Sequence, residues 1–433
     1  MVEPRIVQRA DHPISRKDID HDALKVLYRL REANYTAYLV GGSVRDLLLA
    51  RRPKDFDIGT SAHPSQVKKL FRNCWVIGRR FRLAHVKFGN KVIEVATFRR
   101  QVQAGEEIVQ DGVPAPDPTT PEGEHLIHHD NTFGTPEEDA FRRDFTLNAL
   151  FYDIATFSII DYVGGLDDVR AGLIRCIGDP DVRFREDPVR MLRAIALASR
   201  LNFTIDPPVL DAIGRHRQEI GQSSAPRLLE EYYKILRAGE AEKTFRWLAE
   251  LGLLEPTAAE LHHGADEALW QSLAAVDAYR EQFDATPDTL TNAILMGSFL
   301  VPLGISLNPG RSDNAKKPSI PRLGELPLAR RDVERLRLIL SLQRRLHDTT
   351  ANVRAQHGMA QRPMFKDALT WLEIHGERPE LVEHWKAILA EVRAAGPEEG
   401  ATPEGAEAAE GSADPFKRRR RRRRRRSPRP PEH

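Results

Sequence analysis

The spacing of apolar residues changes along the chain, and each change predicts a different element of secondary structure. Apolar residues at helical spacing mark residues 16–33, and an uninterrupted apolar run at 37–40 is typical of a buried strand. Two glycines follow this run directly, and residues 44–50 then fit a short helix that Pro53 ends. The first fifty residues are therefore expected to form a helix, a strand, a tight turn and a second helix.

A second group of segments extends this pattern to residue 98. We predict one helix and three strands, at 64–73, 75–77, 81–88 and 92–98 in that order. Gly89 and Asn90 suit a hairpin turn between the last two strands. Residues 101–130 are rich in Gly, Pro, Asp and Glu and show little periodicity, so they are expected to form a long mobile loop. The polar residues 1–20 are interpreted as an arm.

Helical spacing dominates the second half of the chain. Residues 231–395 alternate helical segments with polar links, and residues 309–318 predict a loop. Five apolar residues near the end keep helical spacing, which indicates core packing rather than a row of base-stacking side chains. They are Leu381, Trp385, Ile388, Leu389 and Val392. The predicted fold is thus an α/β head with a mixed sheet and helices, followed by an all-α neck and body.

The composition is that of a globular chain with more than one domain. Its 433 residues are 41% hydrophobic, which is compatible with sizeable cores. No apolar stretch approaches the roughly 20 residues that a membrane helix needs, and the N-terminus lacks the apolar core of a signal peptide. Cys74 and Cys176 are expected to be free thiols in a reducing compartment, so the expected location is cytoplasmic.

Charge is concentrated at the C-terminus. The net charge is +2, but residues 417–433 carry eleven basic side chains against one glutamate, a local charge of +10. The preceding 416 residues therefore carry −8. Residues 396–413 suit a flexible acidic linker, and the whole of 396–433 is expected to be disordered. An acidic body with a basic end indicates a polyanionic partner that binds the tail.

Asp55 and Asp57 lie on a segment that is expected to be extended. Residues two apart on a strand point to the same face, so the two carboxylates are expected to stand side by side. Adjacent carboxylates repel each other unless a cation lies between them, and hard oxygen ligands at this spacing suit Mg²⁺. A surface turn with two solvated aspartates is the simpler alternative.

The turn that precedes this pair favours a nucleotide site over the simpler alternative. Gly41 and Gly42 lack a Cβ, so the backbone turns tightly there, and the first N–H groups of the following helix suit a phosphate. Arg45 and Asp46 follow at a fixed spacing. The order Gly-Gly-x-x-Arg-Asp and then Asp-x-Asp resembles the head motif of the nucleotidyltransferase branch that holds tRNA CCA-adding enzymes and bacterial poly(A) polymerases.

The resemblance covers roughly residues 25–240. It implies a nucleotidyltransferase head, two Mg²⁺ ions held largely by Asp55 and Asp57, ATP as the substrate and an RNA 3′ end as the acceptor. It also implies protein partners from RNA decay or RNA chaperones.

The expected domains are an arm at 1–20, a head at 21–165 with its loop 101–130, a neck for nucleotide selection and RNA binding at 166–240, a body at 241–395 and a linker and tail at 396–433.

A second motif lies at residues 141–150. Arg142 and Arg143 carry charge that would neutralise a triphosphate, and Asp144 and Asn148 are four apart, so on a helix they share one face. A carboxylate and an amide there suit hydrogen bonds to a ribose. The run Arg-Arg-Asp-Phe-Thr-x-Asn-Ala resembles the second motif of the same family, in which this aspartate is counted among the catalytic carboxylates. An amphipathic helix with a charged start is the alternative.

A third motif begins at Asp187, which suits the N-cap of a helix with Pro188 at its first position. Arg190 and Arg193 lie three apart and are expected to share a face with Asp187, so these groups suit hydrogen bonds to the edge of a base. Glu-Asp-x-x-Arg resembles the motif with which the family selects the incoming nucleotide. Ala196 stands where some relatives carry a third arginine.

Two basic segments are candidates for RNA binding. Arg79, Arg80 and Arg82 lie near the predicted site, where a phosphate contact and a solvated turn explain them equally well. The tail cannot fold alone because its charges repel, and it is expected to bind RNA phosphates through counterion release, with a membrane surface or another acidic partner as the alternative. Its consecutive arginines are Arg418, Arg419, Arg420, Arg421, Arg422, Arg423, Arg424, Arg425 and Arg426.

Two activities are compatible with these motifs. Residues 78–86 and the basic tail resemble the poly(A) polymerase branch, which predicts polyadenylation of RNA 3′ ends with AMP from ATP and release of pyrophosphate. A tRNA CCA-adding or A-adding nucleotidyltransferase is the alternative, because those relatives share the three motifs. A non-catalytic RNA-binding protein is a third hypothesis, which the intact Asp55, Asp57 and Asp144 oppose.

Overall fold

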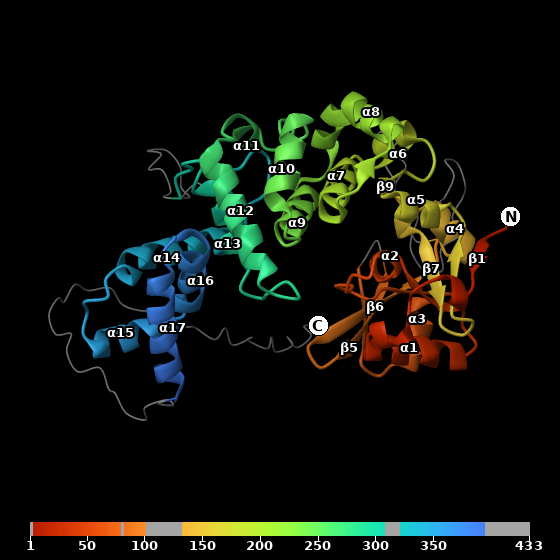
Figure 1. The fold of residues 1–433 in the computed structure, drawn as a ribbon, viewed down its shortest axis with the longest axis horizontal. Coiled ribbons are helices and arrows are strands. Elements are labelled where there is room, and N and C mark those ends of the chain that lie inside the picture. The colour runs from red at the N-terminus through yellow and green to blue at the C-terminus, as the bar shows by residue number, and fades with distance from the viewer. Residues whose placement is uncertain (1–2, 79–81, 101–131, 308–320, 395–433) are drawn as a thin grey trace, which may run out of the picture.

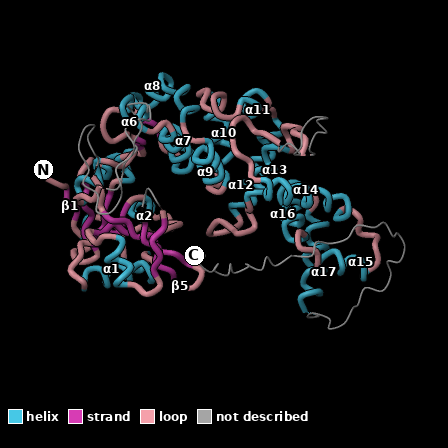
Figure 2. The backbone as a smooth tube through the Cα atoms, turned by 180° about the vertical axis from the view of Figure 1, so that it is seen from behind, coloured by secondary structure: helices cyan, strands magenta, loops and turns pink. Residues whose placement is uncertain are grey.

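The computed structural model describes residues 3–78, 82–100, 132–307 and 321–394. The predicted loops at 101–130 and 309–318 and the segment 396–433 lie outside these ranges. The chain forms a head that contains a sheet, an arch of helices and a helical body at the far end (Figure 1). Seen from behind, the longer strands gather in the head and helices make up most of the rest (Figure 2).

The head is built on one eight-stranded sheet, in the order β1-β8-β7-β2-β3-β6-β5-β4. Neighbouring strands are antiparallel except β3 and β6, so the sheet is mixed, as predicted. The strands are β1 (Arg5–Val7), β2 (Ala37–Val40), β3 (Ile58–Thr60), β4 (Cys74–Ile77), β5 (Leu83–Phe88), β6 (Lys91–Thr97), β7 (Leu150–Asp153) and β8 (Ser158–Asp161).

Short helices connect these strands. They are η1 (Arg9–Asp11), η2 (Arg16–Asp18), α1 (His21–Glu32), α2 (Gly42–Leu48), α3 (Pro64–Leu70), α4 (Pro136–Phe141), η3 (Thr146–Asn148) and α5 (Gly165–Ala171). The predicted helix at 16–33 begins only at His21, because the carboxylate of Asp20 accepts hydrogen bonds from the backbone N–H groups of Asp22 and Ala23. The hairpin predicted at Gly89 is confirmed, and the residue has a φ of +58°.

The N-terminal segment is part of the head rather than a separate arm. Strand β1 pairs with β8 at the edge of the sheet, and Val7 and Ile14 are buried in the main core. Polar composition concealed this role, because an edge strand needs only one buried side to hold its place. The prediction of an arm at 1–20 is therefore wrong for the described part of that segment.

Beyond the head, the regular elements of the described residues are helices apart from one short parallel pair of strands, β9 (Leu173–Ile174) and β10 (Thr204–Ile205). The arch contains α6 (Pro180–Glu186), α7 (Val189–Leu201), α8 (Pro207–His216), η4 (Arg217–Gln222), α9 (Ala225–Leu236) and α10 (Ala241–Glu250). The rest are α11 (Ala259–His263), α12 (Glu267–Glu281), α13 (Asn292–Leu300), α14 (Arg330–Leu346), α15 (Val353–Ala360), α16 (Phe365–His375) and α17 (Pro379–Ala394).

Core packing in the body follows the predicted pattern. On α17, Leu381, Trp385 and Ile388 are buried, while Leu389 and Val392 pack half-buried against the same core. The indole N–H of Trp385 donates to the carbonyl of Leu346 at 2.8 Å, so the one polar atom of this side chain is satisfied. No helix in the described ranges is long and apolar enough to cross a bilayer.

Candidate active site

Asp55 and Asp57 lie just before β3, and both are exposed. The N–H of Val40 donates to the carbonyl of Asp57 at 3.0 Å, so the pairing of β2 with β3 continues to this residue although the strand begins at Ile58. Ile58 is level with Val95 on β6, which places Asp57 beside Glu94 on the same face of the sheet.

The carboxylate of Asp57 lies among other negative charges. The pKa of Asp57 is raised to about 6, mainly by reduced hydration and then by the charges of Glu94 and Asp55, while Arg143 acts to lower it. Asp57 is exposed by area, so the surrounding protein restricts its hydration only in part. The negative charges of Asp55, Asp57 and Glu94 act at one place, and a bound divalent cation would neutralise them.

The donor set fits Mg²⁺ bound together with a phosphate ligand. Among the described residues, no group of three or more His, Cys, Asp or Glu side chains is placed to hold a metal ion alone. Mg²⁺ is commonly bound by one or two carboxylates, with substrate phosphates and water completing its shell. Asp55 and Asp57 supply such a pair, with hard oxygen donors that suit this cation.

The glycine turn lies against an arginine. Gly41 has a φ of +71°, and a Cβ at this position would lie 3.0 Å from Nη1 of Arg143. A side chain would therefore be strained by the backbone and would crowd the guanidinium. Helix α2 starts at Gly42 and has only seven residues, so the nearby cation is a stronger source of positive charge than the helix terminus.

Arg45 is buried and hydrogen-bonded to two neighbours. Its Nε and Nη2 donate to Oδ1 of Asp46 at 2.8 and 2.6 Å, and its Nη1 donates to Oδ1 of Asn148. Burial lowers the pKa of this guanidinium, and the charge of Asp46 partly offsets that effect. These contacts give Arg45 a positioning role, in which it holds Asn148 against α2. The predicted nucleotide contacts of Arg45 and Asp46 remain predictions.

Asp139 on α4 holds the two predicted phosphate-binding arginines. Its buried carboxylate accepts from Nε of Arg142 at 2.9 Å and from Nε and Nη2 of Arg143 at 3.1 and 2.8 Å. Burial acts to raise the pKa of Asp139, but the two guanidinium groups outweigh burial and lower it. Nη1 of Arg143 also donates to the carbonyl of Asn148 at 3.1 Å. The guanidinium of Arg143 is thereby held against the glycine turn, close enough for its charge to act on Asp57.

Asp144 and Asn148 do not share a helix, contrary to the prediction. The segment turns after α4, Phe145 makes an isolated bridge with Cys176, and η3 follows. The two side chains still meet, because Nδ2 of Asn148 donates to Oδ1 of Asp144 at 3.4 Å. Pairing across to residue 176, which has no signature in the local sequence, replaced the helical turn.

Asp144 faces the helical arch. Its Oδ2 lies 2.6 Å from Nη2 of Arg193 on α7, an ion pair not aligned as a hydrogen bond, and its Oδ1 accepts from the N–H of Phe145 at 2.8 Å. Burial acts to raise the pKa of Asp144, but Arg193 and the backbone N–H lower it overall. These contacts join the head to α7. They give no support to a place for Asp144 in the carboxylate pair, a role that remains a prediction.

Asp187 caps the end of α6 rather than the start of α7. Its Oδ2 accepts from Nη2 of Arg227 at 2.5 Å, whereas its buried Oδ1 has no partner among the described residues. Arg190 is buried and donates to the carbonyl of Arg183 at 2.8 Å and to Glu186 at 3.0 Å. Pro188 directly precedes the first residue of α7, so the predicted cap is wrong by one residue.

Two arginines that pattern analysis did not identify support this region. Nη2 of Arg183 donates to the carbonyls of Arg142 and Arg143 at 2.8 and 2.5 Å, and Arg227 holds Asp187. Each of these arginines lies about forty residues along the chain from the group it binds, so no local sequence pattern identifies it. Asp139 did have a signal, since it lies four residues before Arg143, near the end of α4. Of the predicted RNA-binding residues, Arg82 is exposed next to β5, whereas Arg79, Arg80 and Arg418–Arg426 lie outside the described residues.

Three family models match the chain. A model described as the poly(A) polymerase head domain matches residues 37–175, which contain the carboxylate pair, the glycine turn and the Arg142–Asn148 segment. A model described as the probable RNA and SrmB-binding site of polymerase A matches residues 202–263. A model described as the polymerase A arginine-rich C-terminus matches residues 321–427.

The chain is similar to two kinds of curated protein. It is 52% identical over 253 residues to poly(A) polymerase I of Salmonella typhi, which covers 58% of this chain and 52% of that protein. It is 41% identical over 254 residues to poly(A) polymerase I of Haemophilus influenzae, covering 58% and 54%. It is 38% identical over 233 residues to a CCA-adding enzyme of Lactobacillus johnsonii, covering 54% of each. The chain thus spans about half the length of the curated relatives it matches.

Solved structures share the fold over most of the chain. The CCA-adding enzyme of Bacillus stearothermophilus in complex with CTP has a TM-score of 0.58 and 26% identity, and the match covers 85% of this chain and 82% of that one. A tRNA nucleotidyltransferase with a primer tRNA and an ATP analogue has a TM-score of 0.52 and 22% identity, covering 85% and 99%. The second likeness shows the fold alone. Together they confirm the predicted order of an α/β head followed by helical domains.

Proposed function

Because this chain belongs to the family of poly(A) polymerases and CCA-adding nucleotidyltransferases, we propose that it adds AMP from ATP to RNA 3′ ends without a template and releases pyrophosphate. The observation that carries this proposal is a difference in similarity. Identity is 52% to a poly(A) polymerase I but 38% to a CCA-adding enzyme, over matched segments of comparable length. The arginine-rich C-terminal match points to the same branch.

Asp55 and Asp57 are the residues proposed to hold the catalytic Mg²⁺ ions. Bound ions would lower the pKa of the RNA 3′-hydroxyl and neutralise the triphosphate, the chemistry that two-metal sites supply. The raised pKa of Asp57 supports this role, because it reflects reduced hydration and then the negative charges of Glu94 and Asp55, which together exceed the effect of Arg143. Glu94 contributes to that charge from the neighbouring strand, although we do not assign it an ion.

Arg143 is proposed to orient the triphosphate. Asp139 fixes its guanidinium through two hydrogen bonds, and the charge of Arg143 acts on Asp57. A guanidinium held in this way presents its remaining N–H donors without a further loss of side-chain freedom. Gly41 permits this placement by lacking a Cβ, while Arg45 holds Asn148, whose carbonyl accepts from Arg143.

Asp187 is proposed to read the edge of the incoming base. Its Oδ1 is a buried acceptor with no partner in the described structure, and its Oδ2 is held by Arg227. A carboxylate oxygen suits the amino group of adenine, which is a hydrogen-bond donor. Arg190 and Arg193 are engaged with Glu186 and Asp144, so we propose that they position the pocket wall and contact the base only if these pairs rearrange.

We further propose that RNA is held by the neck and by the basic tail. The match at residues 202–263 and the exposed Arg82 support binding by the described part of the chain. The tail supplies positive charge that attracts phosphates with little preference for sequence. Proteins of RNA decay and RNA chaperones are proposed as further partners.

CCA addition to tRNA is the second candidate, favoured by the likeness to a CCA-adding enzyme over 85% of this chain. Incubation with generic RNA and each nucleotide separately distinguishes the two activities. Long tails with ATP alone support polyadenylation. Repair of a truncated tRNA by CTP and ATP, with no extension of generic RNA, would replace the first proposal with the second.

A further inference from the structure

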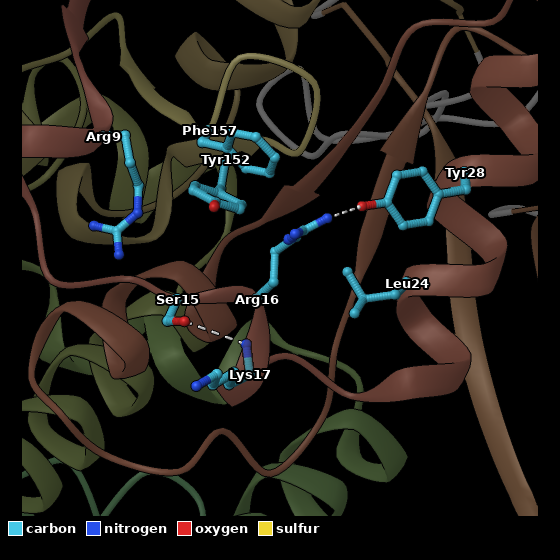
Figure 3. Close-up of a pocket in the computed structure, with 8 residues that line it drawn as sticks. All are labelled: Arg9, Ser15, Arg16, Lys17, Leu24, Tyr28, Tyr152 and Phe157. Atoms are coloured by element: carbon cyan, nitrogen blue, oxygen red, sulfur yellow. Dashed lines mark hydrogen bonds between the residues drawn. The ribbon is translucent and has the colours of Figure 1, made fainter.

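A cavity of about 480 Å³ opens in the head, and none of the candidate active-site residues lines it (Figure 3). It lies between the segment that carries Arg9 and Arg16, helix α1 and strand β7. We call it the α1 cavity. Its volume lies within the range of small-molecule sites, and its residues have no part in the proposed reaction.

The α1 cavity lies on the face of the sheet opposite to the carboxylate pair. Leu39 on β2 is level with Tyr152 on β7 and with Ile58 on β3, so these three side chains share one face. Asp57 precedes Ile58 on extended backbone, which directs its side chain to the other face. A ligand in the α1 cavity is therefore separated from Asp57 by the thickness of the sheet.

A hydroxyl with almost no accessible surface lies in the wall of this cavity. Tyr152 is fully buried, its ring lines the cavity, and its hydroxyl has no hydrogen-bond partner among the described residues. Arg9 and Arg16 are close enough for their charges to act on the hydroxyl, although burial has the larger effect and raises its pKa. Buried hydroxyl groups without a partner are uncommon, because losing hydration without a hydrogen bond is unfavourable.

The walls combine positive charge with apolar surface. Arg9, Arg16 and Lys17 line the cavity, and no carboxylate does so among the described residues. Nη1 of Arg16 donates to the hydroxyl of Tyr28 at 3.1 Å, and the Arg16 guanidinium lies 5.1 Å from the ring centre of Phe157 (Figure 3). The guanidinium is thus held in place with donors to spare.

We propose that the α1 cavity is a second nucleotide site, in which Arg9, Arg16 and the Tyr152 hydroxyl bind a phosphate and apolar side chains hold the base. Leu24 and Phe157 provide the apolar surface, and an aromatic ring packs well against such side chains. Inorganic phosphate alone leaves that surface uncovered. The ligand is a nucleoside monophosphate, either free or at the 5′ end of an RNA strand, and the site stands independently of the proposed reaction.

The test measures AMP binding by calorimetry to the full chain carrying Asp55→Ala/Asp57→Ala, a change that weakens binding at the catalytic site and leaves the α1 cavity intact. We expect one site for AMP in this variant, with affinity reduced at least tenfold by adding Arg16→Gln or Tyr152→Phe. Arg354→Gln, a change at an exposed arginine on α15, is the matched control and should leave the affinity unchanged. Absence of AMP binding and of 5′-phosphorylated RNA binding, or equal affinity in all variants, would overturn the proposal.

Two further arms identify the source of the ligand. Tight binding of AMP with no binding of a 5′-phosphorylated tetranucleotide identifies the free nucleotide, and the opposite result identifies the RNA end. Inorganic phosphate that binds as tightly as AMP contradicts the role of the apolar wall. In the absence of ligand, Tyr152→Phe should leave the melting temperature unchanged or raise it, because the hydroxyl it removes has no partner. A clear fall in melting temperature shows that the hydroxyl is already satisfied and removes it from the site.

Discussion

Asp144 in the head and Arg193 on α7 form an ion pair of 2.6 Å across the junction between the head and the helical arch. The carboxylate is buried and the guanidinium is partly exposed, so solvent screens only one side of the pair. The same carboxylate is linked to Asn148, which Arg45 holds. The junction is therefore continuous with the wall of the candidate active site.

Removing the cation of this pair should destabilise the protein. We expect Arg193→Met to lower the free energy of unfolding by about 1–3 kcal/mol at neutral pH, less than for a fully buried pair because Arg193 is partly exposed.

The folded-state pKa of Asp144 is lowered, so its contribution to stability is present above the unfolded pKa of about 3.9 and is lost as pH falls through the lower folded value. Urea unfolding of wild type and Asp144→Asn from pH 7 to pH 3 measures this, and parallel pH profiles would contradict it.

The opposite sign is expected for Asp57, whose folded-state pKa is raised to about 6. Ionisation of this carboxylate costs stability above its folded pKa, and the cost disappears below its unfolded pKa. Asp57→Asn should therefore stabilise the protein at pH 8, by about 1 kcal/mol after allowance for solvent screening, and leave stability unchanged near pH 3.5. Thermal melts at the two pH values provide the comparison. Asp211→Asn, at an exposed position on α8, is the control.

Magnesium should act through the same pair. We expect Mg²⁺ with a non-hydrolysable ATP analogue to raise the melting temperature at pH 8, because ligands that bind only the folded state stabilise it. The shift should disappear in Asp55→Ala/Asp57→Ala, and nucleotide incorporation should fall at least a thousandfold while RNA retention persists. Incorporation at the wild-type rate in the double variant would show that the site lies elsewhere.

The tail should set the salt dependence of RNA binding. Deleting residues 417–433 removes eleven basic groups, and each phosphate contact on a single strand contributes about 0.7 to the slope of log affinity against log salt. We expect the affinity for RNA to fall and the slope of log affinity against log salt to become smaller by several units. Filter binding between about 50 and 300 mM salt measures both quantities. An unchanged slope would exclude the tail from RNA binding.

Gly165 tests how tightly the motif region is packed. A Cβ at this position would lie 2.2 Å from the carbonyl oxygen of Thr146, which is the start of η3. Gly165→Ala should cost more than about 2 kcal/mol, as overpacking does when backbone must move. Gly214→Ala on α8 is the matched control, since a Cβ there meets nothing within 4 Å and should stabilise the helix. Equal melting temperatures for the two variants would show that η3 yields freely.

Local patterns predicted the elements whose stability is local. Strand β2 matches the apolar run at 37–40 without error, and the Gly89 hairpin follows from its turn residues. The capping error at Asp187 and the missing helix at Asp144–Asn148 have another origin. In both places a contact with a distant residue overrides the local preference. Arg227 binds Asp187, and Cys176 pairs with Phe145. The hydrogen bonds of Asp139 to Arg142 and Arg143 were recognisable from sequence because these residues are three and four positions apart. The contacts of Arg183 were not, because its partners lie about forty positions away.

Arg183 belongs to the helical arch, yet it grips the peptide carbonyls of the two residues proposed to meet the triphosphate. Because the acceptors are backbone carbonyls, these hydrogen bonds couple α6 to the backbone position of Arg142 and Arg143 rather than to a side-chain rotamer alone. A tilt of the arch when it engages RNA would therefore shift the aim of Arg143 toward Asp57. Binding of the RNA strand and binding of the nucleotide would then be coupled through α6, the helix that carries Arg183.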